Sequence, residues 1–189
     1  MKKLVIALGV SALLGACAGT GMSNASSGAA VPMVGGAPMY PTKDIVDNAV
    51  NSKDHTTLVA AVKAADLVAT LKSPGPFTVF APTNASFAAL PAGTVDTLLK
   101  PENKATLTKV LTYHVVPGRM DSAALTSAIN AGGGKAMLKT ASGGTLTATM
   151  SGGTVWVTDA KGGTAAVTIA NVYQSNGVIH VVNKVLLPG

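Results

Sequence analysis

The chain has 189 residues, of which 48% are hydrophobic and 12% charged, and its formal net charge is +6. A single cysteine excludes a disulfide-stapled fold. The lysines are scattered and there is only one arginine, which excludes the cationic stripe of a nucleic-acid-binding protein. Without the two N-terminal lysines, 12 basic and 8 acidic side chains remain, a net charge of +4. We therefore expect no nucleic-acid partner.

Residues 1–16 have the organisation of a signal peptide. Two lysines form a positive n-region, and the apolar run 4–14 that follows is too short to span a bilayer. The sequence Leu14-Gly15-Ala16-Cys17 resembles a bacterial lipoprotein processing site, in which Cys17 becomes the lipidated N-terminus. An ordinary secretory cleavage site also fits these residues. The pattern predicts an exported protein that is lipid-anchored at Cys17 in the bacterial envelope (outer membrane or periplasm), with full secretion as the alternative.

Residues 17–41 are rich in Gly, Ala, Ser, Met and Pro and carry no charge. Such a segment buries too little apolar surface to order itself, so we expect a flexible linker. Met22, Met33 and Met39 supply thioethers of the kind that bind copper. Their spacing is irregular and no histidine lies among them, so we expect no metal there.

Residues 42–189 are enough for one domain with a hydrophobic core and too few for two. Apolar periodicity and capping residues predict helices over five ranges: 44–51, 56–71, 94–99, 101–112 and 121–131. Alternating runs between Gly-rich turns predict strands over five more: 135–140, 145–150, 154–159, 166–171 and 178–187. Helices first and strands later predict an α+β fold.

The stretch 75–87 organises the predicted core. Phe77-Thr78-Val79-Phe80-Ala81 is an aromatic and β-branched run between two prolines, and it predicts a buried strand. Pro82-Thr83-Asn84 follows as a turn whose Thr or Asn caps a short helix containing Phe87. Another strand is expected at 113–116.

Three segments together resemble the fasciclin-like domain family: 75–87, 113–119 and 177–188. They occur in order and at domain-sized separations, and the resemblance covers about residues 41–189. It implies a bacterial secreted or lipoprotein member with a single fasciclin-like domain, a β-sandwich or wedge with several packed helices. Its structural signature falls on these residues: Phe77, Thr78, Phe80, Pro82, Thr83, Asn84, Phe87, His180 and Asn183.

Tyr113 and His114 are the candidate interaction residues, because the resemblance places them at the pair linked to integrin-mediated adhesion in animal relatives. Aromatic and histidine residues in valine-rich segments are more often part of the core, so both interpretations stay open. Asn183 stands where the family usually has Asp, and we expect it on a buried face with His114 or Thr83 as hydrogen-bond partner. A neutral amide keeps hydrogen bonds but cannot form a charged pair with histidine.

No motif for catalysis or metal binding stands out. His55, His114 and His180 lack the spacing of zinc ligands. We expect His55 at the surface and the other two as hydrogen-bonded structural side chains. There is no Gly-x-Ser-x-Gly elbow, and Glu102 is the only glutamate, so paired catalytic carboxylates are absent from the sequence. We expect a non-enzymatic protein without cofactor or metal.

These observations predict a cell-surface or periplasmic adhesion or interaction module that binds an envelope, matrix or host-surface protein or glycan. Its only expected contact with the membrane is the lipid anchor. The alternative is a periplasmic binding protein for a small hydrophobic or glycan ligand held between the helices and the sheet. A deep apolar pocket that includes Tyr113, His114 or Trp156 would favour the alternative.

Overall fold

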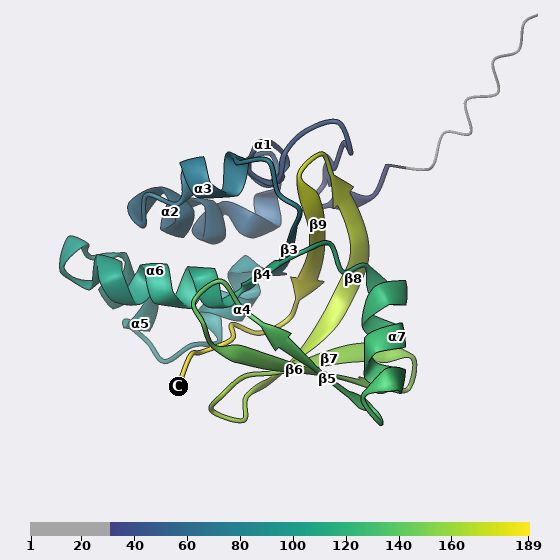
Figure 1. Cartoon of the computed structure of the whole chain (residues 1–189). Coiled ribbons are helices and arrows are strands. Elements are labelled where there is room, and N and C mark those ends of the chain that lie inside the picture. Colours follow the sequence, from purple (N-terminus) through teal and green to yellow (C-terminus); the bar gives the residue numbers. More distant parts are fainter. Residues whose placement is uncertain (1–30) are drawn as a thin grey trace, which may run out of the picture.

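The computed structural model describes residues 31–189 (Figure 1), and its central element is strand β3 (Phe77–Pro82). β3 lies in a seven-stranded sheet of order β4-β3-β9-β8-β7-β6-β5. It pairs in parallel with β9 (Gly177–Val182) and antiparallel with β4 (Val115–Pro117). The buried strand expected at 77–81 is therefore confirmed. The predicted signal peptide and Cys17 lie outside the described residues.

The rest of the sheet is antiparallel and bends sharply. It consists of β8 (Thr164–Gln174), β7 (Thr154–Thr158), β6 (Thr145–Ser151) and β5 (Lys135–Lys139). The register between β8 and β9 shifts twice, between Val167 and Ile169 and between Ile169 and Val172, and such irregularities bend a strand. β8 and β9 run upright in Figure 1, whereas β5 and β6 run across beneath them. The result is the wedge-like α+β fold expected from the sequence.

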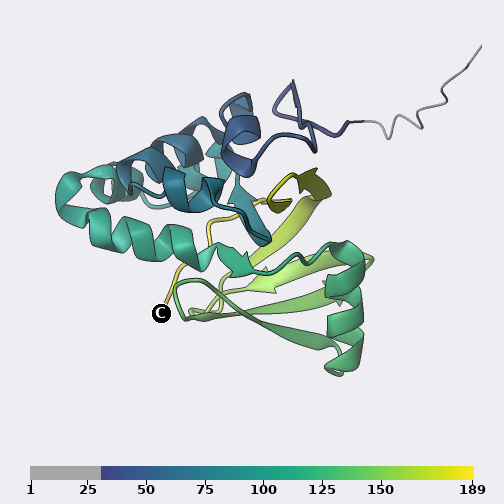
Figure 2. The same cartoon turned by 45° about the horizontal axis from the view of Figure 1, so that its top comes forward.

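Helices cover two separate parts of this sheet (Figures 1 and 2). One group packs over β3 and β9, and α7 (Ser122–Ala131) packs against β5 and β6. Turns of 3-10 helix at Lys53–His55 and Pro101–Asn103 precede α2 and α6. The first group comprises α1 (Ile45–Ala49), α2 (Thr56–Ala64), α3 (Val68–Lys72), α4 (Asn84–Ala88), α5 (Thr94–Leu99) and α6 (Lys104–Tyr113).

The two groups of helices bury two cores, and β3 contributes to both. Val79 and Ala81 pack in the helical core with side chains of α1, α2 and α6. Phe80 is fully buried in the second core, inside the fold of the sheet and beneath α7. A strand that is buried on both faces needs apolar residues at successive positions, which explains why this run does not alternate.

The linker prediction of 17–41 is wrong for its C-terminal part, because residues 33–39 belong to the folded domain. β1 (Met33–Val34) and β2 (Ala37–Pro38) form a hairpin closed by Gly35 and Gly36, whose φ angles are 59° and 76°. Two glycines with positive φ are typical of a tight two-residue hairpin turn. Three side chains of this segment are buried in the helical core: Val34, Ala37 and Met39.

Two other boundaries also differ from the prediction. The helix expected at 56–71 is divided into α2 and α3, because Asp66 takes a left-handed φ of 60° that no helix can continue through. The strand expected at 113–116 is shorter, because Tyr113 is the last residue of α6 and His114 is its C-cap. The apolar spacing of Leu107, Val110 and Leu111 extends to His114, so the helical pattern continues past residue 112.

Phe80→Ala should destabilise the domain by about 3–5 kcal/mol, the usual cost of removing a buried ring. The side chain is fully buried and stacks on His180 with ring centroids 5.7 Å apart. Urea unfolding followed by circular dichroism measures the change. Phe77→Ala, at the half-buried start of the same strand, is the matched control and should cost clearly less. A loss below about 1 kcal/mol for Phe80→Ala would show that β3 is not central.

Candidate functional site

His114 joins the end of α6 to the C-terminal segment. Its Nδ1 lies 2.8 Å from the carbonyl oxygen of Val110, and its Nε2 accepts the N–H of Leu186 at 2.9 Å. A carbonyl can only accept and an amide N–H can only donate, so Nδ1 carries the proton and Nε2 is bare. Burial lowers the pKa of His114 to about 4. The ring is therefore a neutral structural side chain, as the sequence analysis expected.

Tyr113 is also buried, and its hydroxyl is hydrogen-bonded within the domain. Its hydroxyl donates to the carbonyl of Thr145 at 2.8 Å and accepts the N–H of Ala160 at 3.0 Å. A Cβ on Gly144 would lie 2.5 Å from the ring, so a glycine is needed there to admit it. Only 1% of Tyr113 and 3% of His114 is exposed. This burial contradicts their assignment as direct contact residues, because a partner of the folded domain cannot reach them.

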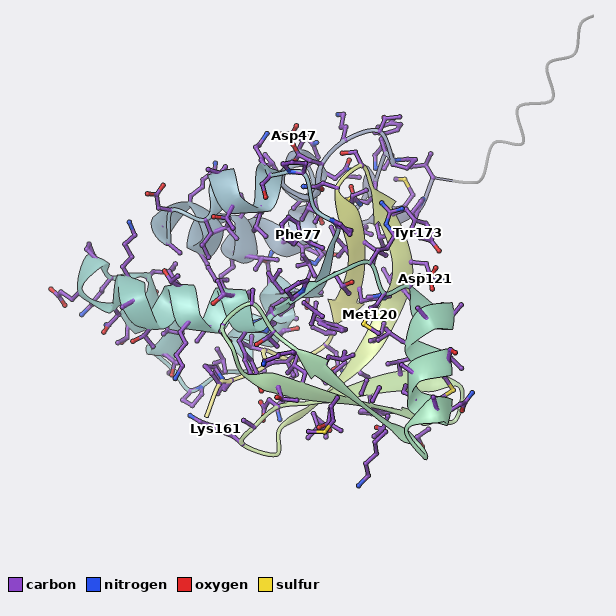
Figure 3. All side chains as sticks on the ribbon, viewed as in Figure 1. Asp47, Phe77, Met120, Asp121, Lys161 and Tyr173 are labelled. Atoms are coloured by element: carbon purple, nitrogen blue, oxygen red, sulfur yellow. The ribbon has the colours of Figure 1, made fainter. Side chains whose placement is uncertain are left out.

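His180 and Thr78 tie the central strand pair to the segment that leads into α7. His180 Nε2 lies 2.8 Å from the carbonyl of Met120, and burial lowers the pKa of the ring. Thr78 donates to the carbonyl of Gly118 at 2.6 Å and accepts the N–H of Met120 at 2.8 Å. Met120 and Asp121 stand at the start of α7 beside Tyr173 of β8, whose hydroxyl donates to Asp121 at 3.3 Å (Figure 3).

Thr83 and Asn84 cap helices, as predicted, although one of the helices is distant in sequence. Thr83 forms a capping box with Ser86 at the start of α4, and Ser86 also donates to the carbonyl of Val182 at 3.1 Å. Asn84 accepts the N–H of Thr57 at 3.0 Å and so caps α2 from outside. Neither Thr56 nor Thr57 caps α2 with its own side chain. Pro82 and Phe87 are buried beside this corner.

Asn183 is exposed, which contradicts its expected burial beside His114 or Thr83. β9 ends at Val182, so Asn183 lies just past the strand and not on its inner face. Its Oδ1 accepts the N–H of Ala166 at 2.8 Å. A carboxylate could accept the same bond, so the change from the family's usual Asp leaves this contact possible.

His55 is also placed differently from the expectation, since only 3% of it is exposed. Its Nδ1 lies 2.9 Å from the hydroxyl of Ser52, and burial lowers its pKa. Each of the three histidines thus has a separate set of neighbours. Within residues 31–189, no cluster of three or more His, Cys, Asp or Glu side chains could hold a metal ion.

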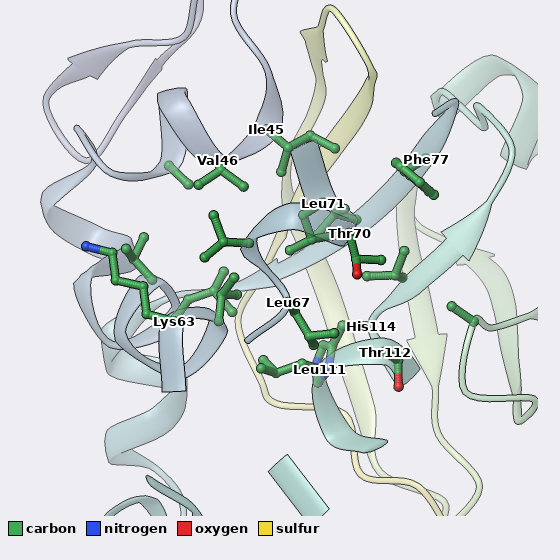
Figure 4. Close-up of a pocket in the computed structure, with 18 of the residues that line it drawn as sticks. Ile45, Val46, Lys63, Leu67, Thr70, Leu71, Phe77, Leu111, Thr112 and His114 are labelled. Atoms are coloured by element: carbon green, nitrogen blue, oxygen red, sulfur yellow. The ribbon is translucent and has the colours of Figure 1, made fainter. Parts of the chain in front are cut away.

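An apolar cavity of about 80 Å³ lies between the layer of α1, α2 and α3 and the layer of β3 and α6 (Figure 4). Its wall includes Leu67, Leu71, Phe77, Leu111 and His114. Because the backbone occupies both nitrogens of His114, the ring offers no free polar atom to a ligand. An apolar molecule suits these walls better than a glycan does.

An open groove of about 930 Å³ lies between α7, β4 and the outer edge of β5, and we call it the α7–β5 groove. Met137 on β5 is 78% exposed, between the exposed Lys135 and Lys139. These residues were not among the predicted site residues, although the alternation Lys-Ala-Met-Leu-Lys places a large apolar side chain on the solvent face of a strand. The other lining residues come from β4, from α7 and the residues just before and after it, and from β6, and they include Val116, Pro117, Met120, Ala128, Ala131 and Gly132.

We expect the buried histidines to make the domain acid-sensitive. Burial lowers the pKa of His114 from 6.5 to about 4, and it also lowers those of His55 and His180. Between pH 4 and pH 6.5, the unfolded chain binds a proton at His114, whereas the folded chain keeps this ring neutral. The stabilisation is therefore complete above pH 6.5 and is lost as the pH falls to 4. We expect His114 alone to account for a loss of about 3 kcal/mol.

Urea midpoints measured from neutral pH down to pH 4 test this dependence, and His114→Gln should flatten the slope because it removes the titrating ring. An NMR titration of the His114 ring in the wild-type domain gives the pKa independently of any variant. A ring pKa of about 6 or higher would contradict the assignment, because it would equal that of an exposed histidine.

Comparisons with known proteins agree with the fold and with the signature segments. The model of the family "Fasciclin domain" matches residues 53–188. Protein sll1483 of Synechocystis sp. is 50% identical over 145 residues, which cover 76% of this chain and 73% of that protein. Immunogenic protein MPB70 of Mycobacterium bovis is 36% identical over 145 residues, covering 74% of this chain and 66% of that protein.

More distant likenesses extend to animals. Transforming growth factor-beta-induced protein ig-h3 of Sus scrofa is 34% identical over 148 residues, which cover 78% of this chain and 20% of that protein. A FAS1 domain pair from the insect cell adhesion molecule fasciclin I shares the fold, with a TM-score of 0.69 and 15% identity over 77% of this chain and 51% of that one. The family is non-catalytic, in agreement with the expectation of a non-enzymatic protein. The family match and the bacterial relatives together establish that the chain belongs to the fasciclin domain family.

Proposed function

We propose that this fasciclin domain is an adhesion or interaction module that is held at the bacterial envelope and binds a macromolecular partner through the α7–β5 groove. The observation that carries the proposal is the open groove itself, about 930 Å³ in volume and flanked by an exposed methionine and two exposed lysines. Exposed apolar side chains beside such a hollow are typical of an interaction site.

The buried signature residues are not available to contact a macromolecule. The polar atoms of Tyr113, His114 and Thr78 bond to the protein's own backbone. Their role is to hold the fold together, so a partner must bind to exposed residues. One structural relative is part of an insect cell adhesion molecule, which supports binding as the activity of this domain.

The position of the groove suits a tethered protein. β1 and β2, where the described chain begins, lie near the β8–β9 hairpin, at the opposite end of the domain from β5 and β6 (Figures 1 and 2). No helix within residues 31–189 is long and apolar enough to cross a membrane. A lipid at Cys17 would supply the attachment, at the end of the chain that enters the domain away from β5 and β6. Many tethered copies bind with avidity even where each contact is weak.

The groove variant Ala131→Tyr should abolish adhesion, because its ring would occupy the groove at the last turn of α7. Beads coated with the mature protein are measured for retention on envelope fractions, on matrix proteins and on glycan surfaces. Ser127→Tyr, which places the same ring on an exposed position of α7 outside the groove, is the matched control and should retain binding. Equal retention of coated and uncoated beads on every surface would overturn the proposal.

A second candidate function is favoured by the apolar cavity beside His114, namely the binding of a small hydrophobic molecule in the periplasm. About 80 Å³ is enough for a small apolar group and not for a large rigid ligand without movement of the helices. Val68 and Leu67 of the wall are only half-buried, so α3 is the side through which such a molecule would enter.

Binding of xenon, a small apolar atom that enters dry apolar cavities, tests this candidate. The wild-type protein should bind it and gain thermal stability as the xenon concentration rises. Val68→Phe should fill the cavity and weaken binding at least tenfold, whereas Val50→Phe, an exposed position outside the cavity, should leave it unchanged. If Val68→Phe binds as tightly as the wild type, the cavity is a packing defect of the core and not a binding site.

A further inference from the structure

β5 is an edge strand whose outer backbone groups face the α7–β5 groove. The sheet order places β6 on one side of β5 and no strand on the other. Thr140 N–H donates toward the β6 side, to the carbonyl of Gly144 at 2.9 Å. The next amide, Ala141 N–H, donates the opposite way, to the carbonyl of Val115 at 2.7 Å. Even-numbered residues of this strand therefore bond to β6, and odd-numbered residues direct their N–H and C=O groups outward.

A glycine at the other end of β5 supports the same alternation. A Cβ on Gly132 would lie 1.9 Å from the carbonyl oxygen of Lys135, so this odd-numbered carbonyl points away from β6 toward the end of α7. Met137 and Lys139 lie between Lys135 and Ala141, so their N–H and C=O groups also point away from β6. The bond from Ala141 to Val115 is where β5 approaches β4, and the two strands do not pair beyond it. Their separation forms the groove.

The side chains on this edge select the chemistry of a partner. Lys135, Met137 and Lys139 share the outward face of β5, in the order cation, apolar, cation. None of the described residues that line the groove is acidic. Asp121, the acidic residue of the α7 region, caps the opposite end of the helix, where it accepts the N–H of Ala124 at 2.8 Å. The lysines are thus left without an anionic neighbour in the groove.

A second copy of the chain is a poor occupant of this edge. Antiparallel pairing of two β5 strands about Met137 would set each Lys135 opposite the other copy's Lys139, and like charges directly opposite are destabilising. Lysines on an edge strand are a common protection against such self-pairing. Residues 1–30 of the chain are a poor occupant too, because they contain no acidic residue.

From this edge we infer that the α7–β5 groove accepts an extended, acidic segment of a partner protein, which adds to the sheet as a strand beside β5. The inference rests on the proposed function and names the partner class. Backbone groups of the segment pair with those of Met137 and Lys139, which supplies affinity independent of sequence. On the outward face, an apolar side chain covers Met137 and a carboxylate on either side pairs with Lys135 and Lys139, which supplies selectivity.

Fluorescence anisotropy with labelled peptides tests the inference on the mature protein. The peptide Thr-Glu-Thr-Val-Thr-Glu-Thr has the required alternation, and its counterpart with Lys in place of Glu reverses the charge. The wild-type protein should bind the acidic peptide at least tenfold more tightly than the basic one. The double variant Lys135→Glu with Lys139→Glu should reverse this order. Lys53→Glu with Lys100→Glu, at exposed positions outside the groove, is the matched control and should keep the wild-type preference.

Met137→Pro separates strand addition from simple charge attraction. In the wild-type protein the N–H of Met137 faces the groove, and proline has no N–H. The variant therefore keeps the hydrogen bonds between β5 and β6, while an added strand loses one donor. We expect this variant to fold and to lose at least tenfold in affinity, while Met137→Ala, which keeps the N–H, changes little. In the wild-type protein, the acidic peptide should slow hydrogen exchange of the Met137 and Lys139 amides, a readout that requires no variant.

The outcomes distinguish the inference from the proposed function. If the acidic peptide binds without slowing these amides, or binds Met137→Pro as tightly as the wild type, strand addition is wrong. If no peptide binds although Ala131→Tyr still abolishes adhesion, the groove is an interaction site for another kind of partner. If the peptide binds as expected but coated beads are retained nowhere, the strand site stands and the adhesive role fails.

Discussion

The parallel pairing of β3 with β9 is the constraint on which the rest of the structure depends. It sets Phe80 opposite His180 and buries every residue of β9 together with most of β3. Parallel neighbours need a long crossover connection. Here the crossover runs from α4 to β8 and contains most of the sheet and the helices α5, α6 and α7. Both hydrophobic cores therefore form against one pair of strands, and the loss of that pair would disconnect them.

The signature residues hold other segments to this pair in a common way. Thr78 and His180 bind backbone groups of residues 118–120, His114 binds those of residues 110 and 186, and Asn84 binds those of residues 53 and 57. Each of these side chains bonds to backbone atoms, which are present whatever side chain that residue carries. Such contacts fix the path of the chain while the rest of the sequence varies. This explains how a short motif specifies the fold without carrying a chemical activity.

Local patterns predicted most of the regular elements. α5, α7 and the hairpins of β5 to β7 follow from apolar periodicity, capping residues and paired glycines, β3 follows from its uninterrupted apolar run between two prolines, and all of them lie close to the predicted ranges. The errors occur where tertiary contacts decide. His55 and Met39 are buried by elements distant in sequence, and Tyr113 closes a helix because its hydroxyl reaches Thr145 and Ala160. Asn183 lies outside its strand because β9 ends where the chain turns toward the His114 contact at Leu186. No single-sequence pattern encodes those neighbours.

The same packing that buries the signature residues also creates the exposed edge of the sheet. The sheet bends at β8 until β4 and β5 approach each other at Val115 and Ala141, and pairing along their whole length would abolish both edges. α7 prevents this closure, because Leu125 and Ile129 enter the second core and the end of the helix lies beside Lys135. A helix that completes the core thereby holds two strands apart. The groove and the free backbone of β5 are therefore consequences of how this fold is packed, and the side chains on β5 determine what can bind there.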